Sequence, residues 1–240
     1  MTEEIVKIEN VWKTYKMGEV DVHALRGVNL TIKKGEFLSV TGPSGSGKST
    51  FMNMIGCLDT PTKGAVYLSN KNISEMSESD LASIRGKKIG FIFQQFNLIP
   101  SLTAQENVML PMLFQKVGEN ERKKRSKKYL DMVGLGDRLD HKPNQLSGGQ
   151  QQRVAIARSL SNEPEMILAD EPTGNLDTQS GKVIMEFLKK LHKEDNTTIV
   201  MVTHDEKVAK QAEKRIYLKD GFIVDDLNKD TQKMIKEANT

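Results

Sequence analysis

Gly42-Pro-Ser-Gly-Ser-Gly-Lys-Ser-Thr50 is the stretch that decides the fold. It fits the pattern G-x-x-x-x-G-K-[ST], whose fixed positions are taken by Gly42, Gly47, Lys48 and Ser49. Glycines let a backbone turn tightly, so that its N–H groups converge on a polyphosphate. A helix that begins here adds the positive end of its dipole. The stretch therefore predicts a nucleoside triphosphate site, in which Lys48 reaches the β- and γ-phosphates and the Ser49 hydroxyl binds Mg²⁺.

The residues on either side of this loop indicate a strand before it and a helix after it. Glu36–Thr41 is short and apolar, and Phe51–Ile55 continues as a helix. Two later apolar runs, Met166–Ala169 and Thr198–Thr203, suit parallel strands buried on both faces, and helical patterns precede each of them. This alternation predicts an α/β fold, a P-loop NTPase core with a mostly parallel sheet.

Two further parts accompany the core. Residues 5–41 alternate in the manner of strands, with turns at Met17-Gly18 and Lys34-Gly35, which predicts an N-terminal antiparallel β subdomain. The middle, about 103–161, shows mainly helical periodicity and predicts an inserted α-helical subdomain. We expect one domain over residues 1–240, made of an ATP-binding core (about 1–95 and 162–225), a helical subdomain (about 96–161) and a C-terminal tail (about 226–240).

Length and composition describe an ordinary globular protein. The chain has 240 residues, 37% of them hydrophobic and 28% charged, and its net charge of +3 is too small to imply nucleic acid as a partner. The single cysteine, Cys57, excludes an internal disulfide framework and is expected to be a small buried hydrophobe. The N-terminus has no apolar core, and no stretch reaches the ~18 apolar residues of a membrane span. These features predict a cytoplasmic chain that serves a membrane only through a partner.

One basic cluster interrupts this balance. Asn120-Glu-Arg-Lys-Lys-Arg-Ser-Lys-Lys128 carries six cations, with no interleaved aromatic residue. A solvated helix face is the favoured interpretation, and contact of Arg122–Lys128 with an anionic headgroup or nucleic acid stays open.

A phosphate loop shows binding, whereas hydrolysis also needs acids that hold a metal and orient water. Asp170 and Glu171 follow the run Met166–Ala169, at the carboxyl edge where α/β sheets place their ligands. Asp170 fits the role of holding Mg²⁺ through water, and Glu171 that of polarising the attacking water. His204 follows another predicted strand, so it either contacts the γ-phosphate or the water, or is structural.

Leu146-Ser-Gly-Gly-Gln150 predicts a second anion site. Ser147 is a good helix N-cap, and Gly148-Gly149 leaves the N–H groups of the helix start exposed. A second helix end of this kind, about 100 residues from the first, has no obvious role within one chain.

Taken together, these motifs resemble the ATP-binding subunits of the ABC transporters over nearly the whole chain. GPSGSGKS, FIFQQ, LSGGQ, ILADEP, NLD and THD stand in the family's order. The stretches GCLDTPTKG, FQQFNLIPSLTAQENV and DEPTGNLDTQSG are similar to the lipoprotein-release and macrolide-export branch. The resemblance implies an ATPase that uses ATP and Mg²⁺, with Glu171, His204, Lys48 and Gln94 as its catalytic residues.

The resemblance also assigns the nucleotide contacts within one chain. Tyr15 would stack on adenine, although from sequence alone it reads as a surface-strand tyrosine. Gln94 would sense the γ-phosphate through metal and water, with Gln95 as the competing position. The residues implied on ATP are Tyr15, Gly42, Pro43, Ser44, Gly45, Ser46, Gly47, Lys48, Ser49 and Thr50. Mg²⁺ would be held by Ser49, Gln94 and Asp170.

The two anion sites are explained by the family's head-to-tail homodimer, in which each ATP lies between one subunit's phosphate loop and the other's signature. Ser147, Gly149 and Gln150 would contact the partner's ATP, and Asp177 would lie at the dimer seam. Phe96–Val108 resembles the surface that docks on a membrane permease. The chain departs from the family at the seam, where the common Ser-Ala-Leu-Asp is Gly174-Asn-Leu-Asp177, which is usual for this branch but leaves the first two roles open.

We expect a subunit located in the cytoplasm, peripheral on the inner face of the cell membrane, that powers export or extraction of a lipoprotein, peptide or hydrophobic drug. A cell-division type of ATPase, coupled to a membrane partner that moves no substrate, remains an alternative. A soluble ABC ATPase of DNA repair or translation is the other alternative. Only about 50 residues separate Gln94 from Leu146, which leaves no room for the coiled-coil insertion of the repair type.

Overall fold

The computed structural model describes residues 3–224, which form two compact units. The first unit contains Met1–Ala82 and Val200–Thr240, and the second contains Ser83–Ile199. The tail predicted at about 226–240 lies outside the described residues. The predicted boundaries of the core and the helical subdomain stay predictions.

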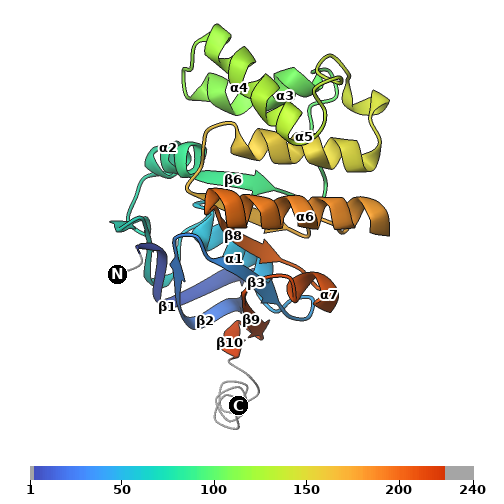
Figure 1. The fold of residues 1–240 in the computed structure, drawn as a ribbon. Coiled ribbons are helices and arrows are strands. Elements are labelled where there is room, and N and C mark those ends of the chain that lie inside the picture. The colour runs from blue at the N-terminus through green and yellow to red at the C-terminus, as the bar shows by residue number, and fades with distance from the viewer. Residues whose placement is uncertain (1–2, 225–240) are drawn as a thin grey trace. The chain divides into compact units, whose positions relative to one another are not determined.

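An antiparallel sheet occupies the N-terminal part of the first unit (Figure 1). Its strand order is β2-β1-β4-β5, with bounds Val20–Lys33, Glu4–Met17, Lys63–Leu68 and Lys71–Asn72. Ile8 lies opposite Leu30 on one side and Val66 on the other; Ile8 and Val66 are buried and Leu30 is half-buried. The alternating pattern of residues 5–41 therefore predicted the antiparallel subdomain correctly as far as Lys33, whereas Phe37–Thr41 belongs to the other sheet.

The first unit also contains the strands and the helix that hold the phosphate loop. In the order β10-β9-β3-β8 the strands are Phe222–Val224, Lys214–Lys219, Phe37–Thr41 and Thr198–Val202, and α1 (Lys48–Ile55) follows β3. β3 and β9 pair in parallel, and every residue of β3 and β8 is buried. A wholly apolar strand fits such a place because both of its faces are covered. The buried parallel strands are confirmed.

The second unit combines two parallel strands with helices. β6 (Ile89–Ile92) pairs in parallel with β7 (Met166–Asp170), Ile89 lying opposite Met166. Helix α2 (Glu78–Lys88) leads into β6. The other helices are α3 (Ala104–Phe114), α4 (Glu119–Met132), η1 (Pro143–Gln145), α5 (Gly148–Leu160) and α6 (Thr178–Asp195). The predicted helical character of 103–161 is confirmed.

Two expectations from composition can be checked against these elements. Cys57 is 1% exposed, as expected of a small buried hydrophobe. Within residues 3–224, no helix has both the length and the apolar character needed to cross a membrane.

A buried amide fixes the turn that precedes α3. Asn107 is fully buried, and its side-chain oxygen accepts a hydrogen bond from the Ile99 amide at 2.8 Å. Its Nδ2 donates to the carbonyls of Thr103, Ile99 and Leu102 at 2.9–3.2 Å. Buried polar groups need hydrogen-bond partners, and the Asn107 side chain supplies them to these four backbone groups of the turn.

We expect Asn107→Ala to lower the free energy of unfolding by about 2–4 kcal/mol, because several buried backbone groups lose their partner. Urea unfolding of the purified chain measures the change. The matched control is Asn120→Ala on the exposed side of α4, for which we expect a change within about 0.5 kcal/mol. Equal effects of the two substitutions would contradict this role for Asn107.

Candidate nucleotide-binding site

The phosphate loop depends on glycine at two positions. Gly42 and Gly47 have backbone φ angles of +148° and +101°, which residues other than glycine rarely adopt. A Cβ on Gly42 would collide with the Leu218 carbonyl oxygen, and a Cβ on Gly47 with that of Ala24. The loop is therefore pressed against β2 and β9, which fixes the path of its backbone.

The polar groups inside this loop fit a bound polyphosphate. Lys48 Nζ donates to the carbonyls of Gly42 and Pro43 at 2.9 and 2.7 Å, so its charge is held over the loop. Ser46 is 2% exposed, and its hydroxyl has no hydrogen-bond partner within residues 3–224. Helix α1 starts at Gly47 without a side-chain cap. Phosphate oxygens would satisfy all of these donors, and the exposed Ser49 hydroxyl in the first turn of α1 suits Mg²⁺.

Tyr15, the predicted adenine platform, is held by two neighbours that the sequence analysis did not single out. Its hydroxyl donates to Asp59 Oδ2 at 3.0 Å, and Lys13 Nζ lies 5.0 Å from its ring centroid. Lys13 Nζ also pairs with Asp59 Oδ1 at 2.5 Å, joining the three side chains. Burial of the hydroxyl raises the pKa of Tyr15, and the Asp59 carboxylate raises it further. The ring is thus neutral and fixed in position.

His204 belongs to the same unit as the phosphate loop. It is exposed directly after β8, where the Thr203 amide donates to the Val40 carbonyl of β3 at 3.2 Å. The two strands that lead to the phosphate loop and to His204 therefore end side by side. Asp205 caps the short helix α7 (Glu206–Ala209) by accepting from the Lys207 amide at 2.7 Å.

The predicted acids end β7 in the second unit. Asp170 is the last residue of the strand and is half-buried, as is Glu171. Glu171 has φ +47°, a left-handed conformation that is uncommon outside glycine and often found where function imposes it. Its carbonyl accepts from the Gly174 amide at 3.0 Å, so the chain turns sharply after the carboxylate.

Gln94 follows the neighbouring strand β6. Because β6 and β7 are parallel and paired, Gln94 and Glu171 emerge at the same edge of the second unit's strands. Asn175 lies against Gln94 and exchanges hydrogen bonds with it at 3.0 and 3.3 Å. Both Gln94 and Gln95 are exposed, and the contact with Asn175 belongs to Gln94.

The signature helix begins with the predicted cap. Ser147 Oγ accepts from the Gln150 amide at 3.3 Å, and Gln150 Oε1 accepts from the Ser147 amide at 2.8 Å, which forms a capping box. A Cβ on Gly149 would lie 2.8 Å from Ser180 Oγ, so this glycine also permits the close approach of α6. Asp177 caps α6, accepting from the amides of Gln179 and Ser180, and its hydrogen bonds to Ser180 hold its pKa below the usual value.

Two polar side chains on α5 hold the segments around Gln94 and Glu171: Gln152, which is buried, and Arg158, which is half-buried. Arg158 donates to the carbonyls of Phe96 and Asn97 at 2.9 and 2.6 Å, and burial lowers its pKa. Gln152, fully buried, donates to the Pro172 carbonyl at 2.6 Å. The sequence analysis did not single them out. No signal in the sequence sets them apart, because Arg153 and Ser159 are polar neighbours in the same stretch.

Three of the six cations of the basic segment pair with acids on the same helix, α4. Lys123 pairs with Glu119 at 2.7 Å, Arg125 with Glu121 at 2.7 Å and Lys127 with Asp131 at 2.9 Å. Ser126, Tyr129 and Leu130 form its buried side. These i,i+4 pairs favour the solvated helix face over a contact with an anionic partner.

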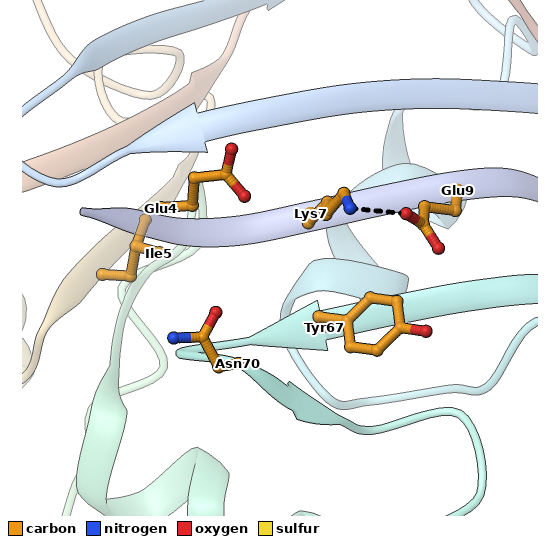
Figure 2. A pocket seen from close by; sticks show the side chains of 6 residues that line it. All are labelled: Glu4, Ile5, Lys7, Glu9, Tyr67 and Asn70. Carbon is orange, nitrogen blue, oxygen red and sulfur yellow. Dashed lines mark ion pairs between the residues drawn. The ribbon is translucent and has the colours of Figure 1, made fainter. Parts of the chain in front are cut away.

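A shallow pocket of about 340 Å³ lies away from all predicted residues (Figure 2). Lys7 and Glu9 of β1 form an ion pair of 2.6 Å in it, beside Tyr67 of β4. Its other lining residues are Glu4, Ile5 and Asn70. Lys7 is the one cation that lines this pocket, and it is already paired with Glu9, so the pocket is poorly suited to bind an anionic nucleotide.

Each unit thus gathers its own share of the predicted site. The first holds Tyr15, the phosphate loop and His204, and the second holds Gln94, the two acids, the signature and Asp177. The roles of these residues in binding and catalysis stay predictions.

Comparisons with known proteins found a matching family pattern, similar sequences and a similar solved structure. The sequence pattern of the ABC transporter family matches residues 25–174. An uncharacterized ABC transporter ATP-binding protein of Methanocaldococcus jannaschii, MJ0796, is 59% identical over 223 residues, which cover 91% of this chain and 95% of that protein. The macrolide export ATP-binding/permease protein MacB of Brucella melitensis is 48% identical over 225 residues, covering 94% of this chain but 35% of that protein.

A solved structure is similar over nearly its whole length. It is the dimeric structure of a post-hydrolysis state of the ATP-binding cassette MJ0796 bound to ADP and Pi. The match has a TM-score of 0.85 and 56% identity, and it covers 92% of this chain and 97% of that one.

We expect Gly47→Ala to lower the affinity for ATP by about 100-fold or more, since backbone strain of about 1–3 kcal/mol adds to a collision that moves the loop. Titration calorimetry with ATP and Mg²⁺ measures the change. Gly134→Ala is the matched control, because Gly134 has φ +70° and a Cβ there meets no atom within 4 Å. Wild-type affinity in Gly47→Ala would contradict the proposed cradle.

Proposed function

The chain belongs to the ABC transporter family, and from this premise we propose that it is an ATPase subunit that powers a separate membrane permease. One observation carries the proposal. In the phosphate loop Lys48 Nζ is held by the carbonyls of Gly42 and Pro43, helix α1 begins without a side-chain cap, and the buried Ser46 hydroxyl lacks a protein partner within residues 3–224. Such a concentration of donors suits the oxygens of a polyphosphate better than any neutral ligand.

The reaction is the hydrolysis of ATP to ADP and phosphate. A water oxygen attacks the γ-phosphorus, and the bond to the departing ADP oxygen breaks. Glu171 polarises this water, His204 orients it, and Lys48 stabilises charge on the transferring phosphoryl group. Mg²⁺, when bound, supplies the positive charge that neutralises phosphate oxygens. The residues proposed to hold Mg²⁺ are Ser49, Gln94 and Asp170.

We propose that two copies of the chain dimerise around two ATP molecules. Support comes from the signature helix, whose positive end begins at the exposed Ser147 and Gly148. The relative MJ0796 has been solved as a dimer bound to ADP and Pi. Ser147, Gly149 and Gln150 then bind the γ-phosphate held by the partner, and Asp177 lies at the seam. Hydrolysis removes the charge that bridges the two copies, so the dimer opens.

The permease is the second proposed partner. The MacB relative, of which this chain spans 35%, is an ATP-binding/permease protein, and this supports a permease as the partner. The docking segment is Phe96–Val108. Arg158 on the signature helix binds the start of this segment, and Asn107 binds the turn within it. The docking segment and the signature helix can therefore move together. The proposed location is cytoplasmic and peripheral, on the inner face of the cell membrane, and the proposed work is export or extraction.

Glu171→Gln is the variant that tests this function. We expect it to bind ATP like the wild type but to hydrolyse it about 100-fold more slowly or worse, because an amide polarises water far less than a carboxylate. ATP-loaded dimers should then accumulate, which size-exclusion chromatography with light scattering measures.

Lys48→Ala is the control, since it removes the charge that holds the phosphates and should stay monomeric with ATP. A monomer of Glu171→Gln at saturating ATP would contradict the dimer, and undiminished hydrolysis would contradict the role of Glu171.

A further inference from the structure

The departure from the family at the seam has a physical counterpart in the second unit. Gly174-Asn175 stands where the resemblance leads one to expect Ser-Ala, and both residues contact Gln94. Gln94 is the proposed metal contact that follows β6.

Asn175 holds Gln94 at two points. Its Nδ2 donates to the main-chain carbonyl of Gln94 at 3.0 Å, and its Oδ1 accepts from Gln94 Nε2 at 3.3 Å. Gln94 Oε1 accepts no hydrogen bond from the described residues. The amide nitrogen is thus engaged while the oxygen stays available, and an amide oxygen is the atom that Mg²⁺ takes as a ligand.

Gly174 provides the space for this contact. A Cβ at this position would lie 2.9 Å from Gln94 Nε2 and 3.2 Å from its Cγ and Cδ. Alanine or serine would therefore push the Gln94 side chain away from Asn175. The two residues act together, since Gly174 leaves space for the Gln94 side chain and Asn175 forms hydrogen bonds with it.

We propose that Asn175 is a positioning residue that orients the Gln94 amide with its oxygen toward the metal, an inference that rests on the proposed function of Gln94. We call the two hydrogen bonds between Asn175 and Gln94 the clamp. The clamp also joins Gln94 to the segment that ends at Asp177, the cap of α6 and the proposed seam residue. A shift of this segment when two copies meet is passed to the amide of Gln94. Because both bonds are solvent-exposed and between neutral groups, the clamp is weak enough to be remade in each cycle.

Side-chain amide spectroscopy tests the clamp without nucleotide or metal. In ¹⁵N-labelled full-length chain, the Gln94 side-chain NH₂ signals are assigned by their loss in Gln94→Glu. We expect Asn175→Ala and Gly174→Ala each to shift these signals, and Asn120→Ala to leave them in place. Unshifted signals in Asn175→Ala would overturn the proposal.

A double-mutant cycle tests the consequence for turnover. We expect Asn175→Ala to lower kcat about fivefold, and to raise the half-saturating Mg²⁺ concentration about as much, with KM for ATP within about twofold. In a Gln94→Ala background the same substitution should change kcat less than about twofold, since its target is gone. Asn120→Ala is again the control.

The outcomes separate the two claims. If Asn175→Ala lowered kcat about fivefold in the Gln94→Ala background too, the inference would be overturned and the proposed function would stand. Full activity and unchanged Mg²⁺ dependence of Gln94→Ala itself would overturn both the proposed role of Gln94 and the clamp that serves it.

Discussion

The convergence of backbone donors between β3 and α1 is the constraint on which the rest of the structure depends. A backbone can supply several N–H groups to one anion only where side chains are absent and the chain is pressed into an unusual path. Here Gly42 and Gly47 pass under the carbonyls of Leu218 and Ala24. Strands β2 and β9 thus contact the loop. The buried strand β3 ends at the loop, beside the end of β8, which His204 follows.

The second unit is organised around links between segments that would otherwise be independent loops. Arg158 and Gln152 extend from the signature helix to the segments after β6 and β7. Asn175 joins Gln94 to the cap of α6. Each of these bonds ends on a backbone carbonyl, so the main chains of these segments are held to one another. The strained Glu171 sits within this group, which fits a residue whose position is imposed by function.

Much of this could be predicted from sequence, because the signals were local. The phosphate loop, the capped helix at Ser147 and the buried strand before Asp170 each follow from a few adjacent residues. The contacts that orient the site could not. Tyr15 and Asp59 are 44 positions apart and Gln94 and Asn175 are 81 apart, and pairs of this kind leave no period in the sequence. Strands β9 and β10 were missed for a related reason. They are short, Lys214–Lys219 begins and ends with charged residues, and its role becomes visible only where Leu218 meets Gly42.

The central claim is that a complete catalytic site needs two copies of this chain. The most direct test is the rate of phosphate release per chain, measured at saturating ATP and Mg²⁺ over a wide range of chain concentration. Our account predicts that the rate per chain rises in proportion to concentration while monomers dominate and levels off once dimers form. A rate per chain that is constant down to the lowest concentration, with the chain shown to be monomeric there, would contradict it.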